Sequence, residues 1–238
     1  MKKYNIAVAD MRIGEDIKAT LPAYAESVVV LPQFKSLAEP VSAHPDMLMW
    51  HVGDSIVTYR SYKDIAAHAF RQLEEAGYRI ICEDDPVSHL YPHDVALNCA
   101  RVGKYLIANQ KTVSKKVAEL ADIHGLSLLH TNQGYAKCST VTVSDNAIIT
   151  ADESIYRLAA KNGIDALLIR QGEVRLDGYG YGFMGGASGV TDSHVLFTGN
   201  LSLHPDASEI TAFCLKHGKA PVSLSRQPLY DYGTVMFL

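Results

Sequence analysis

The sequence of 238 residues has few cysteines and no long apolar segment. Its four cysteines, at positions 82, 99, 138 and 214, are widely separated and include no Cys-x-x-Cys pair, which argues against a disulfide framework. No apolar run approaches the roughly 18 residues of a membrane-spanning helix. The opening run Tyr4–Ala9 is too short for the apolar core of a signal peptide and is typical of a strand. We therefore expect a cytoplasmic protein with reduced thiols and no membrane partner.

A basic surface is also missing. The chain has 22 Lys and Arg residues against 26 Asp and Glu residues, which gives a formal net charge of −4. Because proteins that bind nucleic acids usually carry an excess of basic residues, we expect no nucleic-acid partner. Hydrophobic residues make up 47% and charged residues 20%, as in a folded globular chain that buries a large core.

Segments with the pattern of amphipathic helices recur along the chain. Their apolar residues lie three and four positions apart, which predicts one buried helix face. A glycine directly after a segment predicts the left-handed residue that ends a helix. The four segments of this kind are 63–76, 113–124, 152–162 and 206–217, and a weaker one is 14–25. Short strand-like apolar runs follow them at 28–31, 78–82, 126–129, 166–169 and 221–224.

Hairpins are predicted after most of these runs, because turn residues there separate two apolar stretches. The hairpin segments are 47–59, 95–108, 140–150 and 189–198. The last apolar segment, 232–238, has no partner later in the chain. We predict that the run 4–9 pairs with it, so that the two ends of the chain close a ring.

Helix, strand and hairpin together form a unit that repeats about every 48 residues. No linker rich in proline, serine or charge separates the units, which favours one domain with internal pseudo-symmetry over the whole of 1–238. The predicted units are 10–62, 63–112, 113–151, 152–205, and 206–238 together with 1–9.

The repeat, the run Gly-Tyr-Ala-Lys-Cys-Ser-Thr-Val at 134–141 and the run His-Pro-Asp at 44–46 resemble the pentein superfamily, also called the guanidino-group-modifying-enzyme fold. Within it, the sequence is most similar to an uncharacterised bacterial group. The resemblance implies an α/β fold, a five-bladed pseudo-symmetric α/β propeller around a central channel. The superfamily contains deiminases, dimethylarginine hydrolases, amidinotransferases and a non-catalytic ribosome anti-association factor.

The resemblance also implies a site. Family enzymes use a cysteine nucleophile, a histidine acid/base and carboxylates that hold a planar cation, a pairing that suits bidentate hydrogen bonds. Asp46 and Asp94 lie where such carboxylates are expected, and Asn98 is four residues after Asp94. The position of the family histidine reads Lys137. The C-terminal segment that holds the family nucleophile contains Asp231 and no cysteine.

Cys138 is the candidate nucleophile among the residues of this chain. It follows Lys137, a cation that could lower the pKa of the thiol. The alternative is a half-buried structural thiol at the start of a strand. Ser139 and Ser188 are expected to line the floor of the channel with these two residues.

Two acid–imidazole pairs precede hairpins at equivalent positions, His44 with Asp46 and His93 with Asp94. Such pairs suit proton transfer or cation binding, whereas the alternative is that the aspartates cap turns. His89 and His93 have the spacing of a helical metal pair, but Pro92 between them disfavours a helix. We expect no metal and no cofactor.

A glycine-rich segment at 177–189 nominally contains a Gly-x-Gly-x-x-Gly fingerprint. A strand rather than a helix is predicted after it, so dinucleotide binding is disfavoured. The segment carries Tyr179, Tyr181 and Phe183. It is interpreted either as a mobile lid over a ligand or as a tight loop in which glycines allow close backbone approach.

The sequence thus predicts a protein that binds a small cationic guanidine- or amine-like ligand in a central channel. Asp46, Asp94 and Asp231 would hold the cation, and His44 or His93 would move protons. If chemistry occurs, amidine hydrolysis or amidinotransfer with Cys138 as nucleophile is expected. The alternatives are a non-catalytic binding protein of the same fold and a purely structural repeat domain. The oligomeric state is not indicated.

Overall fold

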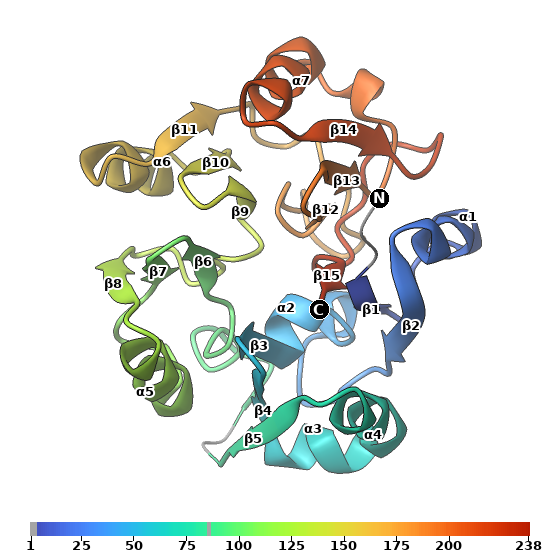
Figure 1. The fold of residues 1–238 in the computed structure, drawn as a ribbon, viewed down its shortest axis with the longest axis vertical. Coiled ribbons are helices and arrows are strands. Elements are labelled where there is room, and N and C mark those ends of the chain that lie inside the picture. The colour runs from blue at the N-terminus through green and yellow to red at the C-terminus, as the bar shows by residue number, and fades with distance from the viewer. Residues whose placement is uncertain (1–3, 85–86) are drawn as a thin grey trace.

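The computed structural model describes residues 4–84 and 87–238, in which five three-stranded sheets surround a common axis (Figure 1). In each sheet the middle strand is antiparallel to the strand nearer the axis and parallel to the outer strand. The fold is therefore the expected α/β propeller with five blades.

The strands are named here by their place in the blades. The inner strands are β3 (Met49–Val52), β6 (Ala100–Val102), β9 (Thr140–Ser144), β12 (Ser188–Val190) and β15 (Met236–Phe237). The middle strands are β4 (Ser55–Tyr59), β7 (Tyr105–Ala108), β10 (Ala147–Thr150), β13 (His194–Phe197) and β1 (Tyr4–Asp10). The outer strands are β5 (Arg79–Glu83), β8 (Ser127–His130), β11 (Asp165–Leu168), β14 (Ala220–Ser223) and β2 (Ala25–Leu31).

A helical segment joins each middle strand to its outer strand, as a parallel pair requires a crossover connection. These helices lie on the outside of the ring (Figure 1). They are α1 (Glu15–Thr20) with η1 (Leu21–Ala23), α3 (Arg60–Ile65) with α4 (Ala67–Glu75), α5 (Lys115–Ile123), α6 (Glu153–Lys161) and α7 (Ala207–Lys216). Three short helices, η2 (Glu39–Val41), α2 (Pro45–Leu48) and η3 (Leu201–Leu203), lie in the connections. Among the described residues, no helix combines the length and apolarity needed to cross a membrane.

Some predicted boundaries shift. The segment 63–76 is two helices, because the backbone at Ala66 (φ −96°, ψ 28°) interrupts α3 and α4. Ile65, the last residue of α3, is 55% exposed, although it lies in a segment predicted to bury its apolar face. The hairpin predicted from residue 47 begins two residues later, since 45–48 forms α2. The hairpin predicted from 95 has regular strand only from Ala100 onward.

The two ends of the chain share one sheet. Strand β15 pairs antiparallel with β1, with Ala7 opposite Phe237 and Val8 opposite Met236. Ile6 and Leu238 extend the pairing through hydrogen bonds in both directions, at 3.2 and 2.9 Å. The predicted closure of the ring through the termini is confirmed. Each sheet combines a hairpin with the helix and strand that follow it; the unit boundaries given above, of which residues 1–3 lie outside the described residues, stay a prediction.

Candidate functional site

Five residues just before the inner strands form a continuous hydrogen-bonded ring, called here the central ring. Each lies two or three positions before its strand begins. In the order of the sheets they are Asp46, Asn98, Cys138, Gly186 and Thr234. Because equivalent positions of five sheets approach the same axis, residues far apart in sequence become neighbours there.

Every neighbouring pair of the central ring is joined by a hydrogen bond. The Asn98 amide donates to the Asp46 carbonyl at 3.1 Å and accepts from the Cys138 N–H at 3.1 Å. The Gly186 N–H donates to the Cys138 carbonyl at 3.0 Å, and the Thr234 N–H donates to the Gly186 carbonyl at 2.8 Å. The Thr234 hydroxyl lies 3.1 Å from Asp46 Oδ2 and closes the ring.

Thr234 has an unusual backbone conformation. Its φ of 71° lies in the left-handed region, which is a genuine outlier for a β-branched residue. Such a conformation costs about 1–3 kcal/mol and persists only where surrounding contacts enforce it. Besides Asp46, the hydroxyl contacts the Gly185 carbonyl at 2.8 Å and Lys137 Nζ at 2.9 Å. These contacts enforce the strained geometry.

Cys138 is held as a protonated thiol. It is 3% exposed, its Sγ donates to Asp46 Oδ2 at 3.2 Å and accepts from the Asn98 amide at 3.0 Å. Burial raises its pKa well above the ordinary value, and the negative charges of Asp46 and Asp231 raise it further. The sequence suggested that the neighbouring Lys137 could lower this pKa, but Lys137 Nζ donates to Thr234 Oγ1 instead.

Asp231 is a buried carboxyl with a strongly shifted pKa. It is 1% exposed and accepts hydrogen bonds from the Phe183 and Gly233 N–H groups at 2.8 and 2.9 Å. Burial, and then the charge of Asp46, raise its pKa to about 7. Burial also raises the pKa of Asp46, whose Oδ1 has no hydrogen-bond partner among the described residues.

His44 lies beside Asp231, with its Nδ1 3.7 Å from Asp231 Oδ1. It is 1% exposed, and Nδ1 makes no hydrogen bond within the described part of the chain. Burial, and then the charge of Arg12, lower the pKa of His44 to about 3, so the imidazole is neutral near pH 7. Arg12 itself is bound by Asp10 through two side-chain hydrogen bonds of 3.0 and 2.6 Å.

A cavity of about 250 Å³, called here the aromatic cavity, opens next to Cys138, Asp231 and His44. Its other lining residues are Val41, Tyr135, Leu176, Tyr179, Gly180, Tyr181 and Phe183. The Tyr135 and Phe183 rings are stacked with centroids 6.1 Å apart, and Tyr181 meets Phe183 edge-on at the same distance. The glycine-rich segment thus forms a wall of this cavity; that it acts as a lid stays a prediction.

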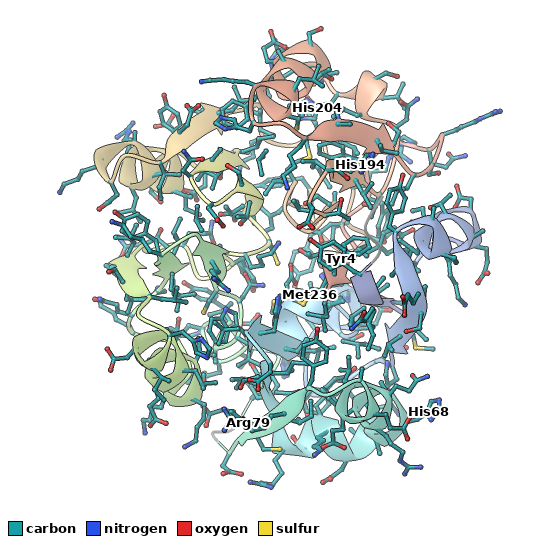
Figure 2. The ribbon with its side chains drawn as sticks, viewed as in Figure 1. Tyr4, His68, Arg79, His194, His204 and Met236 are labelled. Atoms are coloured by element: carbon teal, nitrogen blue, oxygen red, sulfur yellow. The ribbon has the colours of Figure 1, made fainter. Side chains whose placement is uncertain are left out.

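A second cavity of about 340 Å³, the channel cavity, includes a residue from every inner strand. These residues are Trp50, Arg101, Thr142, Val190 and Met236. Met236 is close to the middle of the ring, whereas His68 and Arg79 lie at the rim (Figure 2). Asp46 and Lys137 line this cavity and Cys138 lines the aromatic one, so the central ring lies between the two.

The structure brings together most, not all, of the residues selected from the sequence. His44, Asp46, Asn98, Lys137, Cys138 and Asp231 belong to the network described above. Ser188 is buried nearby and donates to the Gly185 carbonyl at 2.9 Å. Asp94 is linked to the aromatic cavity through Tyr135, whose hydroxyl donates a hydrogen bond to Asp94 Oδ2 at 2.7 Å.

Two selected residues face elsewhere. His93 is exposed and lines neither cavity, although like His44 it precedes an aspartate and a predicted hairpin. Ser139 is buried and lines a separate small cavity near His204. Within the described ranges, no group of three or more His, Cys, Asp or Glu side chains is arranged to hold a metal ion.

The sequence reasoning missed Thr234, Gly186 and Tyr135. Tyr135 lies in the run that carried the family resemblance, but no role was assigned to it. The pair Gly233–Thr234 close to the last strand was a usable signal, since glycine beside a strand often marks close backbone approach.

We expect Cys138 to be an unreactive thiol. Near neutral pH, iodoacetamide should label the half-buried Cys82 first and Cys138 much more slowly, because a buried thiol with a raised pKa holds little thiolate. Mass-spectrometric peptide mapping over time measures this, and a Cys82→Ser variant should lose the fast phase. Labelling of Cys138 as fast as that of Cys82 would contradict the described surroundings.

Asp231 should make stability depend on pH. Between about pH 4 and pH 7 the folded state holds a proton that the unfolded state has lost, so the unfolding free energy falls as pH rises, by at most about 1.4 kcal/mol per pH unit from this group. Asp231→Asn removes this titration, while the other acids and histidines remain in both proteins. The advantage of the parent over the variant in urea denaturation should therefore shrink from pH 5 to pH 7.5; an unchanging difference would mean that Asp231 has an ordinary pKa.

Comparisons with known proteins agree with this architecture. A solved dimethylarginine dimethylaminohydrolase from Pseudomonas aeruginosa, a mutant in complex with citrulline, is 10% identical, with a TM-score of 0.61 over 94% of this chain and 93% of that one. The C. jejuni agmatine deiminase is 10% identical, with a TM-score of 0.55 over 94% and 88% of the two chains.

An arginine dihydrolase from the ornithine–ammonia cycle in cyanobacteria is 10% identical, with a TM-score of 0.55, and its match covers 95% of this chain but 37% of that one. At these identities the likeness shows the fold alone. No curated protein matches the sequence significantly. The model of the family of unknown function DUF6873 matches residues 8–236. The chain therefore belongs to the DUF6873 family and has the fold of the pentein superfamily.

Proposed function

We propose that this protein binds a small organic cation with a guanidine or amine head in the aromatic cavity. The observation that carries the proposal is the combination of aromatic walls with a buried carboxyl, Asp231, in the same cavity. Aromatic faces attract cations, and this attraction strengthens where water is excluded. A carboxylate is the natural partner of a guanidinium or ammonium group.

The size of the cavity supports a small ligand. Its volume of about 250 Å³ is slightly below the range of about 300–1,000 Å³ typical of ligand pockets. Tyr179 and Tyr181 are 48% and 39% exposed, so their rings are available to a ligand that enters from solvent. Two proteins of similar fold are an agmatine deiminase and an arginine dihydrolase, and these names favour a guanidine head group.

The charges around the cavity also favour a cation. Asp231, with a pKa of about 7, ionises readily when a positive group arrives. His44 stays neutral near pH 7 because its pKa is lowered, so it does not repel the ligand. Asp46 Oδ1 has no hydrogen-bond partner among the described residues. Asp94 accepts a hydrogen bond from the hydroxyl of Tyr135, which lines the cavity. Asp46, Asp94 and Asp231 together make the surroundings acidic.

The second candidate function is hydrolysis or amidinotransfer of the bound cation. Cys138 lines the same cavity as Asp231 and His44, which is the placement that a nucleophile, a carboxylate and a proton carrier need. The raised pKa of Cys138 disfavours thiolate attack. We therefore favour a non-catalytic binding protein of the pentein fold over an amidine hydrolase.

Calorimetric titration tests the binding proposal, with agmatine, arginine and guanidinium as probes. We expect one of them to bind, and Tyr181→Ala to weaken it about 3- to 30-fold through loss of a cation–π contact. Tyr156→Ala, on α6 outside the cavity lining, is the matched control and should bind as the parent does. Absence of binding by all three probes, or equal effects of the two substitutions, would count against a cation site here.

A further inference from the structure

The channel cavity has its own chemistry, which the proposed function does not use. Its lining combines apolar side chains, Met49, Trp50, Leu97, Val190, Met236 and Phe237, with charged and polar ones such as His51, Arg101 and Asp145. Lys137 belongs to this lining, and its Nζ donates to Thr234 Oγ1 at 2.9 Å. An amine thus lies beside apolar walls, held in place by a residue with a strained backbone.

The surroundings shift the protonation of this amine toward its neutral, nucleophilic form. Burial lowers the pKa of Lys137 and outweighs the opposing charges of Asp46, Cys138 and Asp231. His51 in the same lining is largely neutral near pH 7, since burial and the charges of Arg101 and Lys137 lower its pKa to about 4. A desolvated lysine of this kind is the usual nucleophile toward carbonyl carbon.

A proton path leads away from the amine. Lys137 Nζ contacts Thr234 Oγ1 at 2.9 Å, and that hydroxyl lies 3.1 Å from Asp46 Oδ2. Burial raises the pKa of Asp46, so its carboxyl exchanges a proton closer to neutral pH than an ordinary aspartate does. Asp46 also lines the channel cavity and can reach a molecule bound there.

Arg101 supplies the feature that selects a ligand. It is exposed on β6 and lines the same cavity, and its Nε reaches the Gly103 carbonyl only at 3.4 Å. Its two terminal nitrogens have no partner in the described part of the chain, so the guanidinium fork is available to a carboxylate. The exposed Asp145 shares the lining and opposes an anion by charge.

We propose that Lys137 forms a reversible imine, in the channel cavity, with a small carbonyl compound that carries a carboxylate, such as a 2-oxo acid. The amine nitrogen attacks the carbonyl carbon, a C–N bond forms, and the C–O bond breaks as the oxygen leaves as water. Both hydrogens of that water come from the amine nitrogen by way of Thr234 and Asp46. No electrons are exchanged. The proposal is independent of cation binding in the aromatic cavity.

Reductive trapping tests it. The full-length protein is incubated with pyruvate and sodium cyanoborohydride, which reduces an imine to a stable secondary amine, and adducts are located by peptide mapping. Lys137 should be modified at least about tenfold faster than the exposed Lys161, although Lys161 is the more accessible amine. Modification of Lys137 at or below the rate of Lys161 would overturn the proposal, and this measurement requires no variant.

Selectivity for a carboxylate is tested with acetone, which is neutral, beside pyruvate. Arg101→Gln on the exposed side of β6 should slow trapping by pyruvate severalfold and leave trapping by acetone unchanged, whereas Asp145→Asn should speed trapping by pyruvate. Lys137→Arg keeps the charge and should abolish the adduct. Equal slowing with both carbonyl compounds in Arg101→Gln would contradict the assigned role of the guanidinium.

Discussion

The rest of the structure depends on the hydrogen-bonded central ring at the axis. Five blades bring five strand entrances to one place, and the polar groups there are removed from water. Buried polar groups are costly unless they bond to one another, which Asp46, Asn98, Cys138, Gly186 and Thr234 do around the whole ring. Position 186 must be glycine, because a Cβ atom there would lie 1.9 Å from Asp231 Oδ1. The ring therefore fixes both the spacing of the blades and the residues that surround it.

The same ring gives its two sides different chemistry. On one side, Cys138, Asp231 and His44 meet aromatic side chains, and the shifted pKa values make an acidic pocket with a neutral imidazole. On the other side, Lys137 shares a cavity with apolar side chains and the guanidinium of Arg101. Two residues adjacent in sequence, Lys137 and Cys138, thus line opposite cavities from the turn that precedes β9. The two proposals, cation binding on one side and imine formation on the other, rest on one arrangement of the backbone.

Much of the fold could be predicted from the sequence because it is encoded locally. The period of apolar residues and the glycine after each segment predict α5, α6 and α7 within a few residues. The break at Ala66 could not be predicted, since it depends on packing rather than on a breaking residue. In the site, the family resemblance selected Asp46 and Asn98, and the neighbouring Lys137 drew attention to Cys138. Repeat equivalence paired Asp46 with Asp94, whereas Asn98 is the residue of that blade in the central ring. Neither the repeat nor the resemblance could distinguish buried His44 from exposed His93, or find Thr234. The burial of a side chain and the left-handed backbone of Thr234 are set by segments distant in sequence.

A double-mutant cycle between Asp46 and Thr234 tests most directly whether the central ring acts as one network. Asp46→Asn and Thr234→Val each remove part of the same contact, between the hydroxyl and Oδ2, with little change in shape. If the ring is coupled as described, the unfolding free energies of the single and double variants should differ from additivity by at least about 1 kcal/mol. Additivity within about 0.5 kcal/mol would show that the two residues contribute independently and would contradict the account.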